Sequence, residues 1–260
     1  MTVDSHGSAP QRRSARVLVL GGTGEARELA GALDAAGVPV VSSLAGRVAR
    51  PRLPAGEVRV GGFGGPQGLA RWLAEHGVGA VVDATHPFAE RISGSAAQAC
   101  EAARVPLLRL DRPGWSERAG DAWHWVDDLA AAAALVPRLG SRVLLTTGRQ
   151  GLAAFAGIGG AWFLVRCVDP PSPPLPPRHR LVIDRGPYTL TPELALIDAH
   201  GIDLVVTKDS GGRHTEAKLD AARRRELPVI VVRRPPGASV PTVGHVGAAL
   251  AWLRSTTQAG

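Results

Sequence analysis

A glycine-rich turn that could bind a phosphate follows the first apolar segment of the chain. Residues 17–20, Val-Leu-Val-Leu, have no polar alternation and predict a buried strand. Residues 21–24 read Gly-Gly-Thr-Gly, and apolar residues at helical spacing between 26 and 33 predict a helix directly after them. Glycines let a ligand approach the backbone closely, and the free amides at a helix start bind phosphate.

The match of this turn to the dinucleotide fingerprint is partial. Gly22 and Gly24 supply the first two glycines, but Arg27 occupies the third position. Glu25 also places an acidic group beside the expected phosphate. The turn by itself is therefore equally consistent with an ordinary strand-to-helix connection.

The residues after the second predicted strand favour NADP over NAD. Proteins that prefer NAD usually carry an acidic residue about 20 positions after the glycines, where it binds the ribose hydroxyls. Here Ser42 and Ser43 end the predicted strand, and Arg47 and Arg50 follow. Small hydroxyls and a guanidinium suit a 2′-phosphate, although a solvated basic loop is the alternative.

Two later strands are predicted to end in polar residues that could take part in chemistry. Asp83 and His86 could be acid–base groups, but Asp83 could also cap the next helix and His86 could bond to the backbone. Lys208 follows an apolar strand and precedes a serine and two glycines, and an ion pair with Asp209 or Asp203 is its structural alternative. Only two of the 30 lysine and arginine residues are lysines, so Lys208 and Lys218 stand out.

The alternation of apolar strands and amphipathic helices predicts an α/β fold. We expect two Rossmann-like or flavodoxin-like domains with parallel sheets and a ligand cleft between them. Residues 1–15 are polar and are expected to form a disordered arm, 16–126 the NADP-binding domain, and 127–255 the second domain. The boundary is placed at 126 because the tryptophan-rich segment 111–126 interrupts the alternation.

Composition excludes several classes of protein. The net charge of +7 suits nucleic acid or an acidic ligand, but the basic residues are scattered and favour no nucleic-acid partner. No apolar run approaches the roughly 20 residues of a membrane span. Cys100 and Cys167 have no metal-ligand spacing and indicate buried thiols in a reducing cytoplasm, with no metal site. The single tyrosine, Tyr188, is followed four residues later by Pro192, which excludes a short-chain dehydrogenase.

Several of these motifs together resemble the precorrin-6A reductase family of cobalamin biosynthesis. In chain order they are GGTGEA, SSLAGR, GGFGG, DATHPFA, TTGR, RGPYT and TKDSGG with Lys218, and the resemblance runs from Arg16 to Leu253. It implies a cytoplasmic enzyme that uses NADPH to reduce one C=C bond of a carboxylated tetrapyrrole, precorrin-6A, to precorrin-6B. The second domain would cover the macrocycle, and transient contact with neighbouring pathway enzymes is expected.

The resemblance and the reading of the strand ends together give the expected site. The cofactor-binding residues would be Gly22, Thr23, Gly24, Glu25, Ser43, Arg47, Thr85, His86, Pro87 and Phe88. The substrate-binding residues would be Arg149, Lys208, Ser210, Gly211, Gly212 and Lys218, because cationic groups recognise carboxylates. The proton could come from water, Lys208 or Tyr188. The alternatives are an NADP-binding sensor without turnover, or a reductase of another acidic conjugated substrate.

Overall fold

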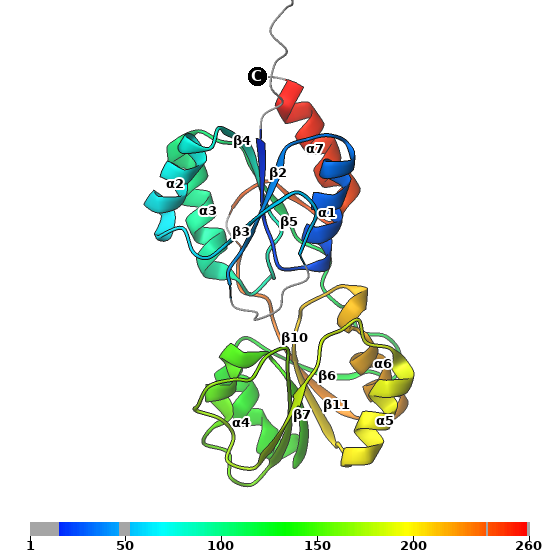
Figure 1. Cartoon of the computed structure of the whole chain (residues 1–260). Coiled ribbons are helices and arrows are strands. Elements are labelled where there is room, and N and C mark those ends of the chain that lie inside the picture. The colour runs from blue at the N-terminus through cyan, green and yellow to red at the C-terminus, as the bar shows by residue number, and fades with distance from the viewer. Residues whose placement is uncertain (1–15, 47–52, 238, 259–260) are drawn as a thin grey trace, which may run out of the picture.

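The computed structural model describes residues 16–46, 53–237 and 239–258, which form two α/β domains stacked end to end (Figure 1). Each domain contains a six-stranded sheet in which the paired strands are parallel. The predicted α/β fold with two parallel sheets is confirmed. In the described part of the chain, no helix combines the length and apolar character needed to cross a membrane.

The first sheet has the strand order β12-β5-β4-β1-β2-β3. Helices α1 and α7 pack against each other on one face of this sheet, and α2 and α3 on the other (Figure 1). The strands are β1 (Arg16–Leu20), β2 (Val40–Leu44), β3 (Glu57–Val60), β4 (Val78–Asp83), β5 (Leu107–Leu110) and β12 (Thr242–Val243). The helices are α1 (Gly24–Ala35), α2 (Gly65–Glu75), α3 (Glu90–Ala103) and α7 (Val246–Gln258).

The second sheet has the order β6-β11-β10-β7-β8-β9. Helices α5 and α6 pack against each other, and α4 contacts the short helix η1. The strands are β6 (Ala122–Val126), β7 (Arg142–Thr146), β8 (Trp162–Cys167), β9 (His179–Ile183), β10 (Leu204–Lys208) and β11 (Pro228–Val232). The helices are α4 (Leu129–Leu139), η1 (Arg149–Phe155), α5 (Leu190–His200), η2 (Arg213–Thr215) and α6 (Ala217–Arg224).

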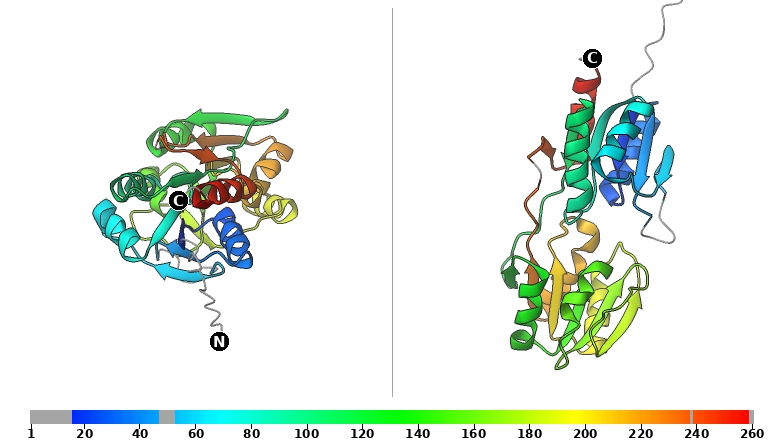
Figure 2. Two further views of the ribbon diagram at one scale, coloured as in Figure 1. Left: turned by 90° about the horizontal axis from the view of Figure 1, so that it is seen from above. Right: turned by 90° about the vertical axis from the view of Figure 1, so that its left-hand side faces the viewer.

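The domain boundaries differ from the prediction at both ends of the second domain. Strand β6 pairs with β11 and belongs to the second sheet, although it was assigned to the first domain. Strand β12 pairs with β5, and α7 buries Val246, Ala249 and Leu253 in the core beside α1, so the end of the chain returns to the first domain. Each sheet is thus completed by a strand that follows a crossing between the domains, and the two crossing segments run side by side (Figure 2).

Uniformly apolar strands occupy the centre of each sheet because helices cover both faces. Side chains of β1 point alternately into two core clusters, with Val17 and Val19 on the α1 side and Leu18 and Leu20 on the α2 side. The same alternation places Leu204 and Val206 of β10 in one core cluster of the second domain and Val205 in the cluster on the other face of the sheet. The polar residues that follow these strands are therefore delivered to the carboxyl edges of the sheets.

Candidate functional site

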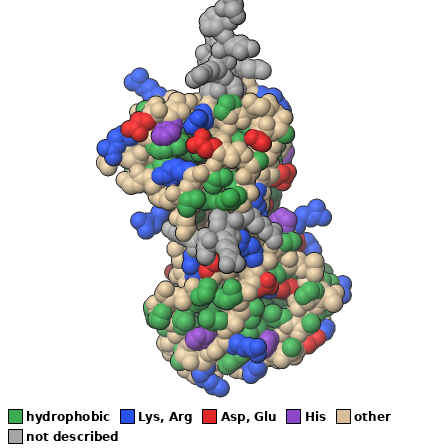
Figure 3. Space-filling view, viewed as in Figure 1, with side chains coloured by type: hydrophobic (Ala, Val, Ile, Leu, Met, Phe, Trp, Pro, Cys, Tyr) green, Lys and Arg blue, Asp and Glu red, His purple; other side chains and the backbone are tan. Residues whose placement is uncertain are grey.

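The carboxyl edges of the two sheets meet at the junction between the domains (Figure 1). His86, after β4, places its Nε2 atom 3.1 Å from the Oγ atom of Ser210, after β10. Ligands of open parallel sheets bind outside the carboxyl ends of the strands. The structure therefore brings together the polar strand ends that the sequence singled out, and lysine and arginine side chains lie beside this junction (Figure 3).

The glycine turn between β1 and α1 fits a bound phosphate. Gly22 has a φ of +118°, and an added Cβ there would meet nothing within 4 Å. Thr23 caps α1: its Oγ1 accepts from the amide of Ala26 at 3.1 Å and donates to the carbonyl of Ala84 at 2.8 Å. Its hydroxyl is thus used within the protein, while the backbone beside Gly22 is open to a ligand. Gly24 lies close to His214 of the second domain, since an added Cβ would be 3.2 Å from the imidazole.

The end of β2 carries a buried hydroxyl without a partner. The Oγ atom of Ser42 has no hydrogen bond among the described residues. Ser43, beside it, accepts a long hydrogen bond of 3.4 Å from Nη1 of Arg59 in β3. Ser43 therefore lies beside Arg59 at the end of β2, where the sequence predicts a cofactor ribose, whereas Ser42 is buried within the strand and Arg47 is outside the described residues.

Arg59 lies beside Ser43 at the candidate site and was not singled out from the sequence. Its guanidinium lies 3.7 Å from the ring centroid of Phe63 and donates to the carbonyls of Gly61 and Gly62 at 2.7 Å each. It faces Ser43 in the register of β2 and β3. The available signal was an arginine inside the short segment 57–60, and the pairing of this strand with β2 is known only from the structure.

Asp83 serves the structure of the β4 end. It is 2% exposed, and its Oδ2 accepts from Nη1 of Arg109 at 2.5 Å. Its Oδ1 accepts from both the amide and the hydroxyl of Thr85. Nη1 of Arg109 also donates to Ser93, so these groups brace the loop that carries Thr85 and His86.

His86 is neutral and carries its proton on Nε2. Burial, followed by the positive charges of Arg112 and Lys208, lowers its pKa from 6.5 to about 3. Nδ1 accepts from the amide of Phe88 at 3.2 Å, so Nε2 carries the proton and donates to Ser210. His86 therefore acts as a hydrogen-bond donor between the domains, and the acid–base alternative is disfavoured.

Phe88 anchors the first domain to the second. Its ring packs against the core cluster of the second domain that contains Leu152 and Phe155. The Nζ atom of Lys208 lies 5.0 Å from its ring centroid, within range of a cation–π contact. Pro87, which precedes it, is buried.

Lys208 lies at the centre of the junction, half-buried. Burial lowers the pKa of its ammonium, and the nearby charge of Glu90 partly opposes that effect. Arg149 begins η1, shortly after the carboxyl end of β7, and is also half-buried. Both cations therefore lie at the edge where a ligand is expected.

Gly211 and Gly212 make room for the segment that connects the domains. A Cβ at Gly211, whose φ is +60°, would lie 2.3 Å from the carbonyl oxygen of Pro113 and 2.4 Å from Nη2 of Arg234. A Cβ at Gly212 would lie 2.8 Å from Cδ of Arg112. Close backbone packing explains both glycines, so their expected contact with substrate has no support in this geometry.

Lys218 and Tyr188 make contacts within the second domain. Lys218 is 3% exposed, and its Nζ donates to the carbonyl of Thr215 at 2.6 Å. Its side chain therefore does not lie at the surface, where the sequence analysis expected it to contact the substrate. The hydroxyl of Tyr188 donates to the carbonyl of Asp184 at 3.2 Å, and burial raises its pKa. Its ring lies against the guanidinium of Arg166, with 3.9 Å between Cζ and the ring centroid.

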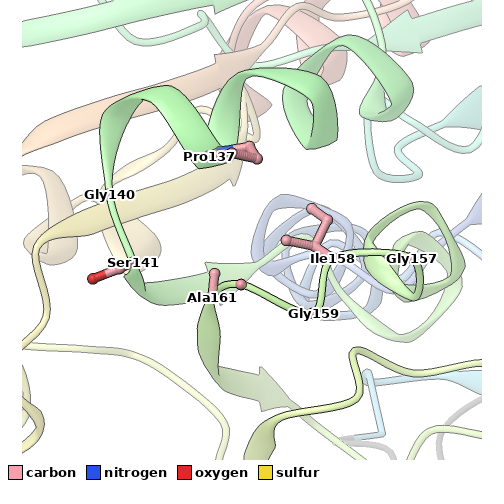
Figure 4. A pocket seen from close by; sticks show the side chains of 8 residues that line it. Pro137, Gly140, Ser141, Gly157, Ile158, Gly159 and Ala161 are labelled. Carbon is pink, nitrogen blue, oxygen red and sulfur yellow. The ribbon is translucent and has the colours of Figure 1, made fainter.

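Two surface hollows are lined by residues other than those at the carboxyl ends of the strands. One, of about 390 Å³, is lined by Pro137, Ser141, Ile158 and Ala161 and lies at the amino ends of β7 and β8 (Figure 4). The other, of about 350 Å³, borders Arg112, Trp115 and Arg213 at the connection between the domains. Among the described residues, no group of three histidine, cysteine or acidic side chains is placed to hold a metal ion.

Comparison with known proteins agrees with this arrangement along nearly the whole chain. A family model described as precorrin-6x reductase CbiJ/CobK matches residues 16–254. A precorrin-6A reductase of Rhodococcus erythropolis is 54% identical over 245 residues, which cover 94% of this chain and 99% of the relative. One of Mycobacterium tuberculosis is 50% identical over 240 residues, 92% of this chain and 97% of the relative.

A more distant relative and a solved structure extend the comparison. A cobalt-precorrin-6A reductase of Salmonella typhimurium is 34% identical over 249 residues, 84% of this chain and 87% of the relative. The solved structure of CobK precorrin-6A reductase superposes with a TM-score of 0.89 at 43% identity, covering 93% of this chain and 97% of that one. The glycine turn, the strand ends at the junction and these matches agree, and the chain belongs to the precorrin-6A reductase family of cobalamin biosynthesis.

Proposed function

We propose that this protein uses NADPH to reduce one C=C bond of precorrin-6A, giving precorrin-6B. The observation that carries the proposal is the position of the open Gly22 turn at the same sheet edge as His86 and Lys208, in a chain of this family. The bound nicotinamide would supply the hydride. The residues of the chain would then have to hold the two reactants together and deliver a proton.

NADPH is proposed over NADH because of the residues at the end of β2 and directly after it. Residues 42–46, Ser-Ser-Leu-Ala-Gly, include no acid that would bind a 2′-hydroxyl and repel a 2′-phosphate. Ser43 and the guanidinium of Arg59 lie together there, and the unpartnered Ser42 hydroxyl is the kind of group that a ligand satisfies. Arg47 stays a proposed contact from the sequence.

Lys208 is the proposed proton donor. Its ammonium carries a proton at the junction, and burial lowers its pKa toward values at which proton transfer is easier. His86 is unsuited to the task because it is neutral, and its proposed role is to hold Ser210 and the loop of Lys208 in place. Arg149 is proposed to bind a carboxylate of the substrate through charge-assisted hydrogen bonds.

The metal-free substrate is the proposed one. Relatives named precorrin-6A reductase are 43–54% identical to this chain, whereas those named cobalt-precorrin-6A reductase are 28–34% identical. Sequence distance alone supports this choice. A direct comparison of the two substrates is therefore part of the test.

The test is anaerobic incubation of the protein with precorrin-6A and NADPH. We expect the substrate to gain two hydrogens in mass and to lose its long-wavelength absorbance, more slowly with NADH or with the cobalt-containing substrate. Quenching of tryptophan fluorescence by NADPH without turnover of either substrate would identify a sensor and refute the reductase. Lys208→Met is expected to lower the turnover rate by about 100-fold or more while NADPH affinity changes little.

A further inference from the structure

An arginine of the segment that connects the domains reaches the start of α1. Nη1 of Arg112 donates to Oε2 of Glu25 at 2.7 Å, and its Nε donates to the carbonyl of Ser210 at 2.7 Å. The Arg112 side chain is 15% exposed. One guanidinium thus touches the first turn of α1 and the β10 loop of the second domain.

Glu25 occupies an unusual position for a phosphate site. It is the second residue of α1, where the positive end of the helix dipole attracts any anion. A carboxylate at that position competes with a phosphate for the positive end of the helix dipole, and its negative charge repels the phosphate. The ion pair with Arg112 neutralises Glu25, so the turn stays suitable for an anionic ligand.

The surroundings keep the guanidinium close to the turn. A Cβ at Gly212 would lie 2.9 Å from Nε of Arg112 and 3.5 Å from Oε1 of Glu25, so the backbone of Gly212 packs directly on the pair. Arg112 also borders the 350 Å³ hollow that it shares with Trp115 and Arg213. Its side chain is therefore held firmly and is still reachable from solvent.

We propose that Arg112 binds the diphosphate of the cofactor together with the amides at the start of α1, and that Glu25 is the positioning residue that holds its guanidinium. An arginine presents five donors in a planar fork, which lets it contact a carboxylate and a phosphate at once. This inference rests on the proposed function. Because NADPH and NADH share the diphosphate, Arg112 contributes to affinity for both and not to the choice between them.

The test measures binding of NADPH and NADH by tryptophan fluorescence in the full-length protein. We expect Arg112→Gln to weaken both nucleotides by about tenfold or more, the usual effect of losing one hydrogen bond to a charged group. Binding of adenosine 2′-monophosphate, which lacks the diphosphate, is expected to stay unchanged. Arg118→Gln is the matched control, because Arg118 lies in the same segment but is 57% exposed and pairs with Glu216.

A double variant separates binding from a purely structural role. In Arg112→Gln, Glu25 is left as an unpaired carboxylate beside the phosphate site, so adding Glu25→Gln is expected to restore part of the lost affinity. A purely structural role of Arg112 in linking the domains predicts no such recovery. Arg112→Lys, which keeps the charge but loses the fork, is expected to weaken both nucleotides less, and it provides the test if Arg112→Gln does not fold.

Three results would overturn the inference while leaving the reductase proposal intact. They are an effect of Arg112→Gln no larger than that of Arg118→Gln, a loss confined to NADPH, and no recovery in the double variant. Failure of the unaltered protein to bind either nucleotide would overturn the proposed function as well.

Discussion

Replacing the buried lysine of α6 is expected to change how stability depends on pH. The ammonium of Lys218 is 3% exposed, donates to the carbonyl of Thr215 at 2.6 Å, and lies 4.5 Å from the ring centroid of Trp115. Burial is the main reason that its pKa is lowered from 10.5 to about 7; the charge of Arg166 acts in the same direction, and the charges of two glutamates oppose it. The charged form is therefore destabilised by folding.

The size and sign of the effect follow from proton linkage. A change of pKa from 10.5 to about 7 corresponds to at most about 5 kcal/mol at 1.36 kcal/mol per pH unit. Below pH 7 both the native and unfolded states hold the proton, so the full penalty is present. As the pH rises toward 10.5 only the unfolded state retains it, and the penalty disappears.

Lys218→Met removes both the penalty and one hydrogen bond. The carbonyl of Thr215 loses its donor, at a cost of about 1–3 kcal/mol that does not depend on pH. We therefore expect the variant to be more stable than the wild type by about 2–4 kcal/mol at pH 6. Near pH 10 the order is expected to reverse.

Urea unfolding of both proteins between pH 6 and 10 measures this difference. Arg224→Met is the matched control, since it removes an exposed charge from the same helix. Its free energy of unfolding is expected to change with pH in the same way as that of the wild type. Parallel profiles of the wild type and Lys218→Met would refute the reasoning, because they would show that Lys218 titrates alike in both states.

Three further predictions concern stability and are tested by urea unfolding. His86→Gln removes a group whose pKa falls to about 3 on burial, so the wild type is expected to lose stability relative to the variant below pH 6.5, by at most about 1.4 kcal/mol per pH unit; an unchanged difference between pH 7 and 4.5 would contradict this. Gly211→Ala is expected to cost about 2 kcal/mol or more, because its Cβ would overlap Pro113 and its φ is positive, whereas Gly159→Ala has open space and serves as the control; equal costs would be the contrary result. Glu193→Gln leaves the buried guanidinium of Arg166 without its charged partner and is expected to cost about 3–5 kcal/mol. The apolar pair Arg166→Met with Glu193→Leu is expected to cost less, and a greater loss in the pair would contradict the argument.

Much of the candidate site was predictable because strand ends are encoded locally. Apolar runs such as 17–20 and 204–206 are buried on both faces, so the polar residues after them reach the carboxyl edge. His86 and Ser210 were both selected in this way, and the structure places them in contact. Their partnership could not be predicted, because residues 124 positions apart meet only when the two domains dock.

Other roles depended on contacts that no local pattern records. Lys218 follows a glycine loop, as a ligand-binding residue can, but it turns inward beneath Trp115. Phe88 follows the β4 motif yet packs into the core of the other domain. Gly211 resembles a glycine of a ligand loop, but the close approach it permits is that of the connecting segment.

The α/β class, the glycine turn, the polar strand ends and the family could all be predicted from the amino-acid sequence, since each of these is encoded by contiguous residues or by motifs in a set order. In contrast, the assignment of residues 122–126 to the second sheet and the return of residues 242–258 to the first domain depend on how the whole chain folds. An apolar strand or amphipathic helix satisfies its hydrogen bonds and buries its apolar face equally well at the edge of either sheet. The choice is made by long-range pairing and packing between the domains, and the same docking brings Arg112 to the start of α1.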